Sequence, residues 1–167
     1  QTDRATTLVG DLENLHKNLL GGGSFIFRGQ VTAVESLDQD LLKAAKKHLA
    51  DVAEQVFDRY NEAPVRAETN LAEKFLRLNN LKAVTTATDP MGLVQIVSGT
   101  PRIDSNHKAL VSIKDYIDRS GSLDGKRLTD HFTSAPFGWS ADTLRYLVSA
   151  LLVNGEIKLK ISEIGRA

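Results

Sequence analysis

The sequence contains no cysteine, and this absence removes several kinds of chemistry at once. Disulfides, thiolate zinc sites, iron–sulfur clusters and cysteine nucleophiles all require a thiol, so none of them can be built from this chain. A chain without cysteine suits a reducing compartment, and we therefore expect a cytoplasmic protein.

The chain also lacks a net charge, because 21 lysines and arginines balance 21 aspartates and glutamates. Wholesale electrostatic binding of nucleic acid needs a net or strongly local positive field, which argues against that function. No apolar run approaches the ~20 residues of a membrane span, and no signal-peptide pattern opens the chain. The first residue is Gln1 and the only methionine is Met91, so we expect a fragment or a processed chain.

Recognisable catalytic motifs are missing as well. The nearest approach to a phosphate-binding loop is the run from Gly121 to Arg127, which is one residue too short and has arginine where a hydroxyl is required. No Gly-x-Ser-x-Gly elbow occurs. No two histidines have the helical spacing of a metal site; the four are His16, His48, His107 and His131. We therefore expect no cofactor, no metal and no enzymatic activity in this segment.

Helical periodicity dominates the first half of the chain. Leucines at helical spacing predict a helix from Asp3 to Leu20, ended by three glycines. Aromatic and β-branched residues predict a strand over Ser24–Val31, with Gly29 at a bend or bulge. A long apolar stripe predicts a helix from Leu37 to Tyr60, and a shorter one predicts a helix over Glu68–Leu78.

The middle of the chain is less regular. The apolar run Leu93–Val97 is compatible with a strand or a short buried helix, because periodicity alone cannot separate them. The stretch Ser98–Asn106 has the composition of a loop and is the predicted domain boundary. The sequence thus predicts a helical domain with short strands over residues 1–99 and a second domain over residues 100–167.

The sequence of the second domain predicts three helices followed by a strand. The helices are predicted over His107–Arg119, over Lys126–Phe132 and from Ser140, the expected N-cap, to Asn154. Gly155 stands at the C′ position, and Glu156–Ile161 alternates as a strand does. This order is winged-helix-like, so the expected fold class is mostly α with minor β.

One segment resembles a known family. The run "GKRLTDHFTSAPFGWSADTLRYLVSALLVNGEIKL", with "NHKALVSIKDYI" and "GSFIFRGQ" upstream, is similar to the carboxy-terminal portion of large P-loop ATPases of BREX phage-resistance systems. The most specific part is the corner Pro136–Trp139. The resemblance implies a piece of a cytoplasmic, multidomain ATPase of a defence complex, with the nucleotide-binding motifs elsewhere and the remaining ATPase chain and other defence proteins as partners.

The residues on the exposed face of the third predicted helix distinguish DNA binding from protein docking. A helix that reads DNA exposes residues such as Arg, Lys, Asn, Gln or Ser. The face turned away from the leucine stripe instead offers Tyr146, Ala150 and Val153, which favour docking onto a protein. Candidate phosphate contacts are the following basic residues: Lys126, Arg127, Arg145, Lys158 and Lys160.

The sequence therefore predicts a non-catalytic docking region of a BREX-type ATPase. Direct DNA binding through the C-terminal domain is the alternative, and a free-standing regulatory scaffold is the third hypothesis. Trp139 is interpreted as a core anchor that staples onto the helix behind it, with Gly138 allowing the chain to turn.

Overall fold

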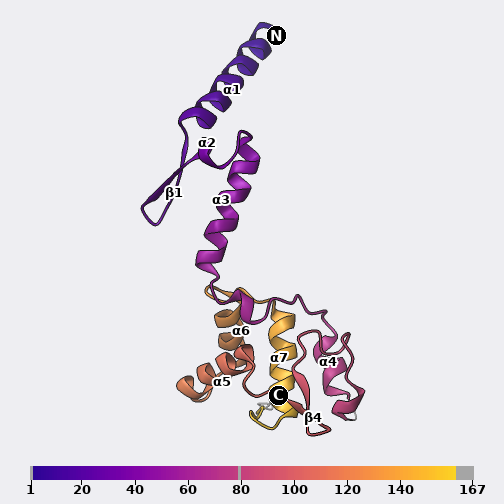
Figure 1. The fold of residues 1–167 in the computed structure, drawn as a ribbon. Helices are drawn as coiled ribbons and strands as arrows, with labels where there is room; N and C mark the ends of the chain where they lie inside the picture. The colour runs from indigo at the N-terminus through magenta and orange to yellow at the C-terminus, as the bar shows by residue number, and fades with distance from the viewer. Residues whose placement is uncertain (1, 79, 161–167) are drawn as a thin grey trace, which may run out of the picture. The chain divides into compact units, whose positions relative to one another are not determined.

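The computed structural model describes residues 2–78 and 80–160 (Figure 1). It is mostly helical with two small antiparallel hairpins, which confirms the predicted fold class. The chain divides into two compact units between Val56 and Phe57. No helix within the described ranges is long and apolar enough to cross a membrane.

The first unit contains α1 (Thr2–Gly22), a hairpin of β1 (Ser24–Phe27) and β2 (Gln30–Ala33), α2 (Val34–Leu37) and α3 (Leu41–Val56). The predicted single strand is instead a hairpin, in which Ile26 pairs with Val31. Arg28 and Gly29 form its two-residue turn, and both have positive φ, 49° and 81°. This is the turn that matches the twist of paired strands, so a glycine signals a reversal here and not a bulge.

The long helix predicted from Leu37 to Tyr60 is also shorter than expected. The helix is interrupted between α2 and α3, where the Asp40 carboxylate accepts a hydrogen bond from the backbone N–H of Lys43 at 2.9 Å. Aspartate competes for backbone donors in this way and therefore starts helices better than it continues them. The apolar stripe continues through the break, which is why periodicity alone did not reveal it.

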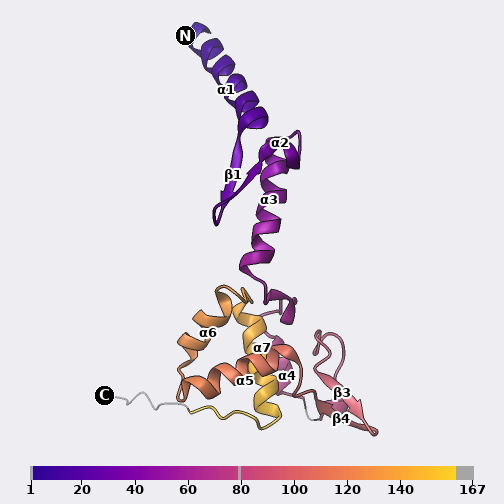
Figure 2. The ribbon, with the colours of Figure 1, turned by 60° about the vertical axis from the view of Figure 1, so that its left-hand side comes forward.

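The second unit begins with η1 (Tyr60–Glu62), α4 (Leu71–Leu76) and η2 (Leu81–Ala83). A hairpin of β3 (Val94–Val97) and β4 (Thr100–Ile103) follows, and then α5 (Lys108–Ser120), α6 (Gly125–Thr133) and α7 (Ala141–Val153). Helix α7 lies in the middle of this unit and contacts α4, α5 and α6, as both ribbon views show (Figure 2).

The domain boundary predicted at residue 99/100 differs from the observed one. Ser98 and Gly99 form the turn of the β3–β4 hairpin, in which Val97 pairs with Thr100. Leu93, before this turn, and Ile103, after it, belong to one buried cluster. A Ser-Gly-Thr-Pro stretch has the composition of a linker, but here it forms a tight turn within one folded unit.

The predicted ends of α7 agree with the structure. The Ser140 side chain accepts a hydrogen bond from the backbone N–H of Thr143 at 3.1 Å, as an N-cap does. At the other end the N–H of Glu156 reaches the Leu151 carbonyl and the N–H of Gly155 reaches the Leu152 carbonyl, each at 3.0 Å. These two bonds, with Gly155 at φ 73°, form a Schellman motif.

The predicted trailing strand over Glu156–Ile161 is not formed by residues 156–160, and Ile161 lies outside the described residues. Alternation shows which side of an extended segment is apolar, but a strand also needs a ladder partner. Strand β4 pairs with β3, and residues 157–160 have no ladder with either. Ile157 still packs against the core, which accounts for the apolar side of the pattern.

Candidate functional site

The face of α7 that was predicted to dock a partner is largely inside the second unit. Tyr146 and Ala150 are 0% exposed, so the prediction that they form an outer docking surface is wrong. Of the three residues named for that surface, Val153 alone reaches solvent, with 43% exposed. The leucine pattern predicts one buried stripe on α7, whereas the helix packs against three others, α4, α5 and α6.

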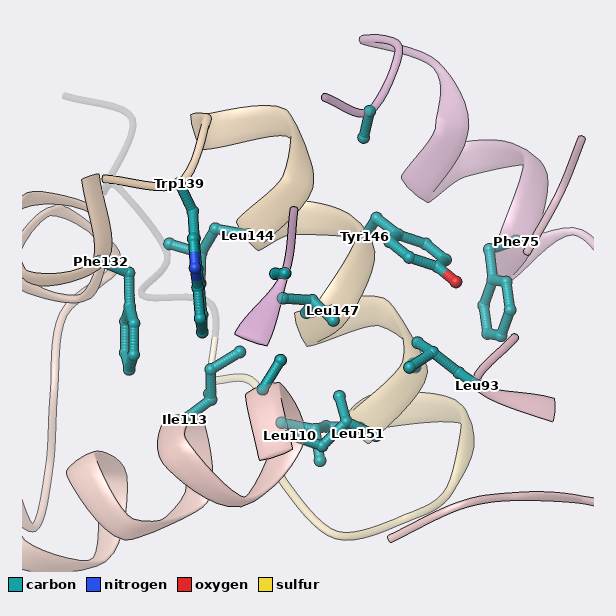
Figure 3. Packing of buried hydrophobic residues seen from close by; sticks show 14 of the residues in the cluster. Phe75, Leu93, Leu110, Ile113, Phe132, Trp139, Leu144, Tyr146, Leu147 and Leu151 are labelled. Carbon is teal, nitrogen blue, oxygen red and sulfur yellow. The ribbon is translucent and has the colours of Figure 1, made fainter. Parts of the chain in front are cut away.

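Two contacts hold Tyr146 in this position. Its ring packs edge-on against Phe75 of α4, with ring centroids 5.5 Å apart (Figure 3). Its hydroxyl donates a hydrogen bond to a carboxylate oxygen of Asp89, which is 5% exposed. Burial, with the Asp89 carboxylate beside it, raises the pKa of the Tyr146 hydroxyl. The tyrosine therefore stays neutral and acts as a donor to a buried anion.

Asp89 in turn fixes the segment that covers α7. Its two carboxylate oxygens accept the backbone N–H groups of Leu93 and Val94, each at 2.8 Å. Further along α7, the Thr143 hydroxyl donates to the Val65 carbonyl at 2.6 Å and accepts the Ala67 N–H at 3.1 Å. Hydrogen bonds thus join the covering segment to α7 at two places. No sequence motif predicts either of them.

The candidate phosphate-contacting residues are distributed over three elements. Lys126 and Arg127 are exposed in the first turn of α6, and Lys158 and Lys160 are exposed after α7. These four make no ion pair with the described residues. Arg145 on α7 is paired with Asp142 at 2.6 Å, which offsets its charge.

The Pro136–Trp139 corner is structural, as predicted. Gly138 has φ +64°, which favours glycine, and Trp139 is 2% exposed. The Trp139 ring stacks on Phe132 at a centroid distance of 5.0 Å (Figure 3). Arg59 closes the same corner, because its guanidinium lies 4.4 Å from the centroid of the Phe137 ring.

Three of the four histidines have identifiable local contacts. His48 stacks on Phe25 and His131 stacks on Tyr116, at centroid distances of 4.7 and 3.8 Å. His107 accepts the backbone N–H of Ala109 at the start of α5. Burial, with a smaller effect of the nearby Arg59 charge, lowers the pKa of His131. Within residues 2–78 and 80–160, no group of three or more His, Asp or Glu side chains could hold a metal ion.

Two neighbouring apolar side chains at the end of β3 are exposed. Ile96 is 77% exposed and Val97 is 51% exposed; we call these two residues the hairpin tip. Figure 2 shows the hairpin at the edge of the unit, away from α6. The tip ends the apolar run Leu93–Val97, for which periodicity left a strand and a short buried helix open; the predicted domain boundary began directly after it, at Ser98.

Three helices around a shared core, with a two-stranded hairpin attached, define the second unit as a helix-turn-helix domain of the winged class. The hairpin precedes the three helices in the chain. Residues 74–164 match the family model of the BREX ATP-binding protein BrxC winged helix-turn-helix domain. The match spans more than half of the 167 residues, and the chain belongs to this family.

The family assignment confirms the resemblance to BREX ATPases and gives the chain a role in a BREX system. Searches among curated proteins and among solved structures gave no match.

Proposed function

We propose that this chain is a non-catalytic docking region of a BREX ATP-binding protein, and that it contacts its protein partner through the hairpin tip. The observation that carries the proposal is the burial of α7. In DNA-binding helix-turn-helix domains the second helix of the motif enters the major groove and presents polar side chains to the bases. Here the corresponding helix is α7, with Tyr146 and Ala150 in the core.

The chemistry of the hairpin supports a protein partner. A wing that contacts DNA carries cations for the phosphates, whereas the hairpin tip consists of an exposed isoleucine and an exposed valine. The hairpin contributes one cation, Arg102, and its paired strands hold the apolar side chains in a fixed place. Large exposed apolar side chains on a rigid element are typical of interfaces between proteins.

The base of the hairpin is bonded to the residues that directly follow α7, so the surface is preorganised. Ser105, shortly after β4, donates to Glu156 at 2.6 Å and accepts from the Asn154 side chain at 3.0 Å. Glu156 also pairs with Lys114 of α5. A contact made at the hairpin would therefore not have to order a loose segment, which lowers the entropic cost of binding.

The absence of catalysis is part of the proposal. It is supported by the lack of a phosphate-binding loop in the sequence and of a candidate metal cluster in the described residues. ATP turnover would belong to another part of the ATP-binding protein. Purified chain incubated with ATP and magnesium should release no phosphate above the buffer control, and sustained turnover would refute this part.

The docking surface is tested by Val97→Asp in the full BREX ATP-binding protein. Leu76→Asp is the matched control, because Leu76 lies at the end of α4 and is also 51% exposed. Co-purification with the other proteins of the system should be lost for Val97→Asp and retained for Leu76→Asp. Equal retention by both variants would refute the hairpin tip as the contact.

DNA binding is tested separately with duplex DNA in a salt titration. We expect no binding even at low salt, where phosphate contacts are strongest. Binding that is lost in the double variant Lys126→Ala and Arg127→Ala would favour the alternative function instead.

A further inference from the structure

Helix α1 presents a row of leucines that the described chain leaves in solvent. Leu8, Leu12, Leu15 and Leu19 are 62, 65, 55 and 40% exposed, and we call them the leucine seam. Helix α1 meets α2 and α3 of its own unit, and both ribbon views place these contacts near its C-terminal end (Figures 1 and 2). Four exposed leucines along one face are unusual for a helix that contacts the rest of its unit only near its C-terminal end.

The spacing of the leucines in the seam indicates what kind of element would pack against it. The leucines follow one another at four, three and four residues, which is the a and d pattern of a heptad repeat. A helix that packs on a globular core has a wider apolar stripe, whereas a narrow a and d stripe is typical of a coiled coil. The expected occupant is therefore a second helix with the same repeat.

A second copy of α1 meets this requirement in the parallel orientation. With Leu12 and Leu19 at a, and Leu8 and Leu15 at d, the flanking g position holds Asp11 and the e position holds His16. In a parallel pair the g residue of one helix faces the e residue of the next heptad in the other. Asp11 of each copy then faces His16 of the other, whose imidazole N–H can donate a hydrogen bond to the carboxylate, and symmetry forms this contact twice.

The remaining flanking positions contain no repulsion in this register. Arg4 at g faces Val9 at e, and Asn18 at g has no facing e position, because α1 ends at Gly22. An antiparallel pair would instead bring g residues opposite g residues and e residues opposite e residues, which separates Asp11 from His16. We propose that two copies of this chain associate through the leucine seam as a short parallel coiled coil. This inference goes beyond the proposed function and does not depend on the hairpin tip.

The first test measures the mass of the full chain in solution by sedimentation equilibrium. Leu12→Glu places a charge in the centre of the seam, and glutamate has nearly the helix propensity of leucine, so the variant tests burial and not helix formation. The control is Leu42→Glu on α3, because Leu42 is 64% exposed and lies outside the seam.

The wild type and Leu42→Glu should dimerise with similar dissociation constants, whereas Leu12→Glu should weaken the dimer by about a hundredfold or more. A monomeric wild type at all concentrations would overturn the proposal. So would a Leu12→Glu variant that dimerises as well as the control.

The second test determines the orientation and uses the absence of cysteine in the sequence, because any introduced thiol is the only one. Leu8→Cys should form an interchain disulfide in mild oxidant, since parallel helices place position 8 opposite itself. An antiparallel pair would place it opposite Leu19 and leave it uncrosslinked. Lys17→Cys, on the outer f position of the heptad, is the control and should not crosslink.

Crosslinking only when Leu8→Cys and Leu19→Cys chains are mixed would refute the parallel orientation. Crosslinking of Lys17→Cys at the same rate as Leu8→Cys would show that collision, and not a seam, joins the chains. Neither readout involves a BREX partner, so failure here is distinguishable from failure of the proposed docking function.

Discussion

The substitution Tyr146→Phe tests the bond that holds the covering segment on α7. It removes the hydroxyl that donates to Asp89 and keeps the ring that packs on Phe75. Asp89 would retain the backbone N–H groups of Leu93 and Val94, so the buried carboxylate loses one of three partners. A hydrogen bond to a charged group contributes about 1.5–3 kcal/mol, and we expect a loss of about 2 kcal/mol in the free energy of unfolding.

The assay is urea unfolding of the full chain, with thermal unfolding as a second measure. For a unit of this size, about 2 kcal/mol corresponds to a fall of roughly 6–12 °C in Tm. Tyr116→Phe is the matched control, because Tyr116 is half-buried and its hydroxyl makes no hydrogen bond within the described residues. The control should change the free energy of unfolding by less than about 0.5 kcal/mol.

The pH dependence gives an independent check of the same bond. Because the pKa of Tyr146 is raised in the folded state, its contribution to stability is complete below the unfolded value of about 10 and is lost as the pH rises above it. Wild type should therefore lose stability above pH 10 more steeply than Tyr146→Phe. Equal alkaline slopes, or an unfolding free energy that Tyr146→Phe leaves unchanged, would refute the reasoning.

Three further outcomes are expected. Because burial and Arg59 lower the pKa of His131, stability should fall as the pH drops below about 6.5, and His131→Phe should flatten this acid slope in thermal unfolding. Gly138→Ala should lower the free energy of unfolding by about 1–3 kcal/mol, because the added Cβ would lie 2.6 Å from Cδ1 of Phe57 and residue 138 has a positive φ. In urea unfolding, adding Phe57→Ala to this variant should remove the cost of the clash but not the cost of the positive φ. Asp124→Ala should cost about 1 kcal/mol in urea unfolding by removing the N-cap of α6, whereas Asp124→Ser should restore most of it.

The sequence alone determined those features that depend on neighbours along the chain. The cap at Ser140, the stop at Gly155 and the turn at Gly138 each follow from the backbone needs of a few consecutive residues. The three C-terminal helices were predicted within a few residues for the same reason. The burial of Trp139 was also predicted from the sequence, but its stacking on Phe132 of α6, the preceding helix, was not.

Tertiary structure decided which faces of these helices are covered. Tyr146 and Ala150 lie off the leucine stripe, and nothing near them in sequence predicts that α4 and the segment fixed by Asp89 would enclose them. The same limit explains the missing strand after Glu156, because a strand depends on a partner elsewhere in the chain. Local propensity determines what an element is, whereas exposure and strand pairing depend on residues far away in the sequence.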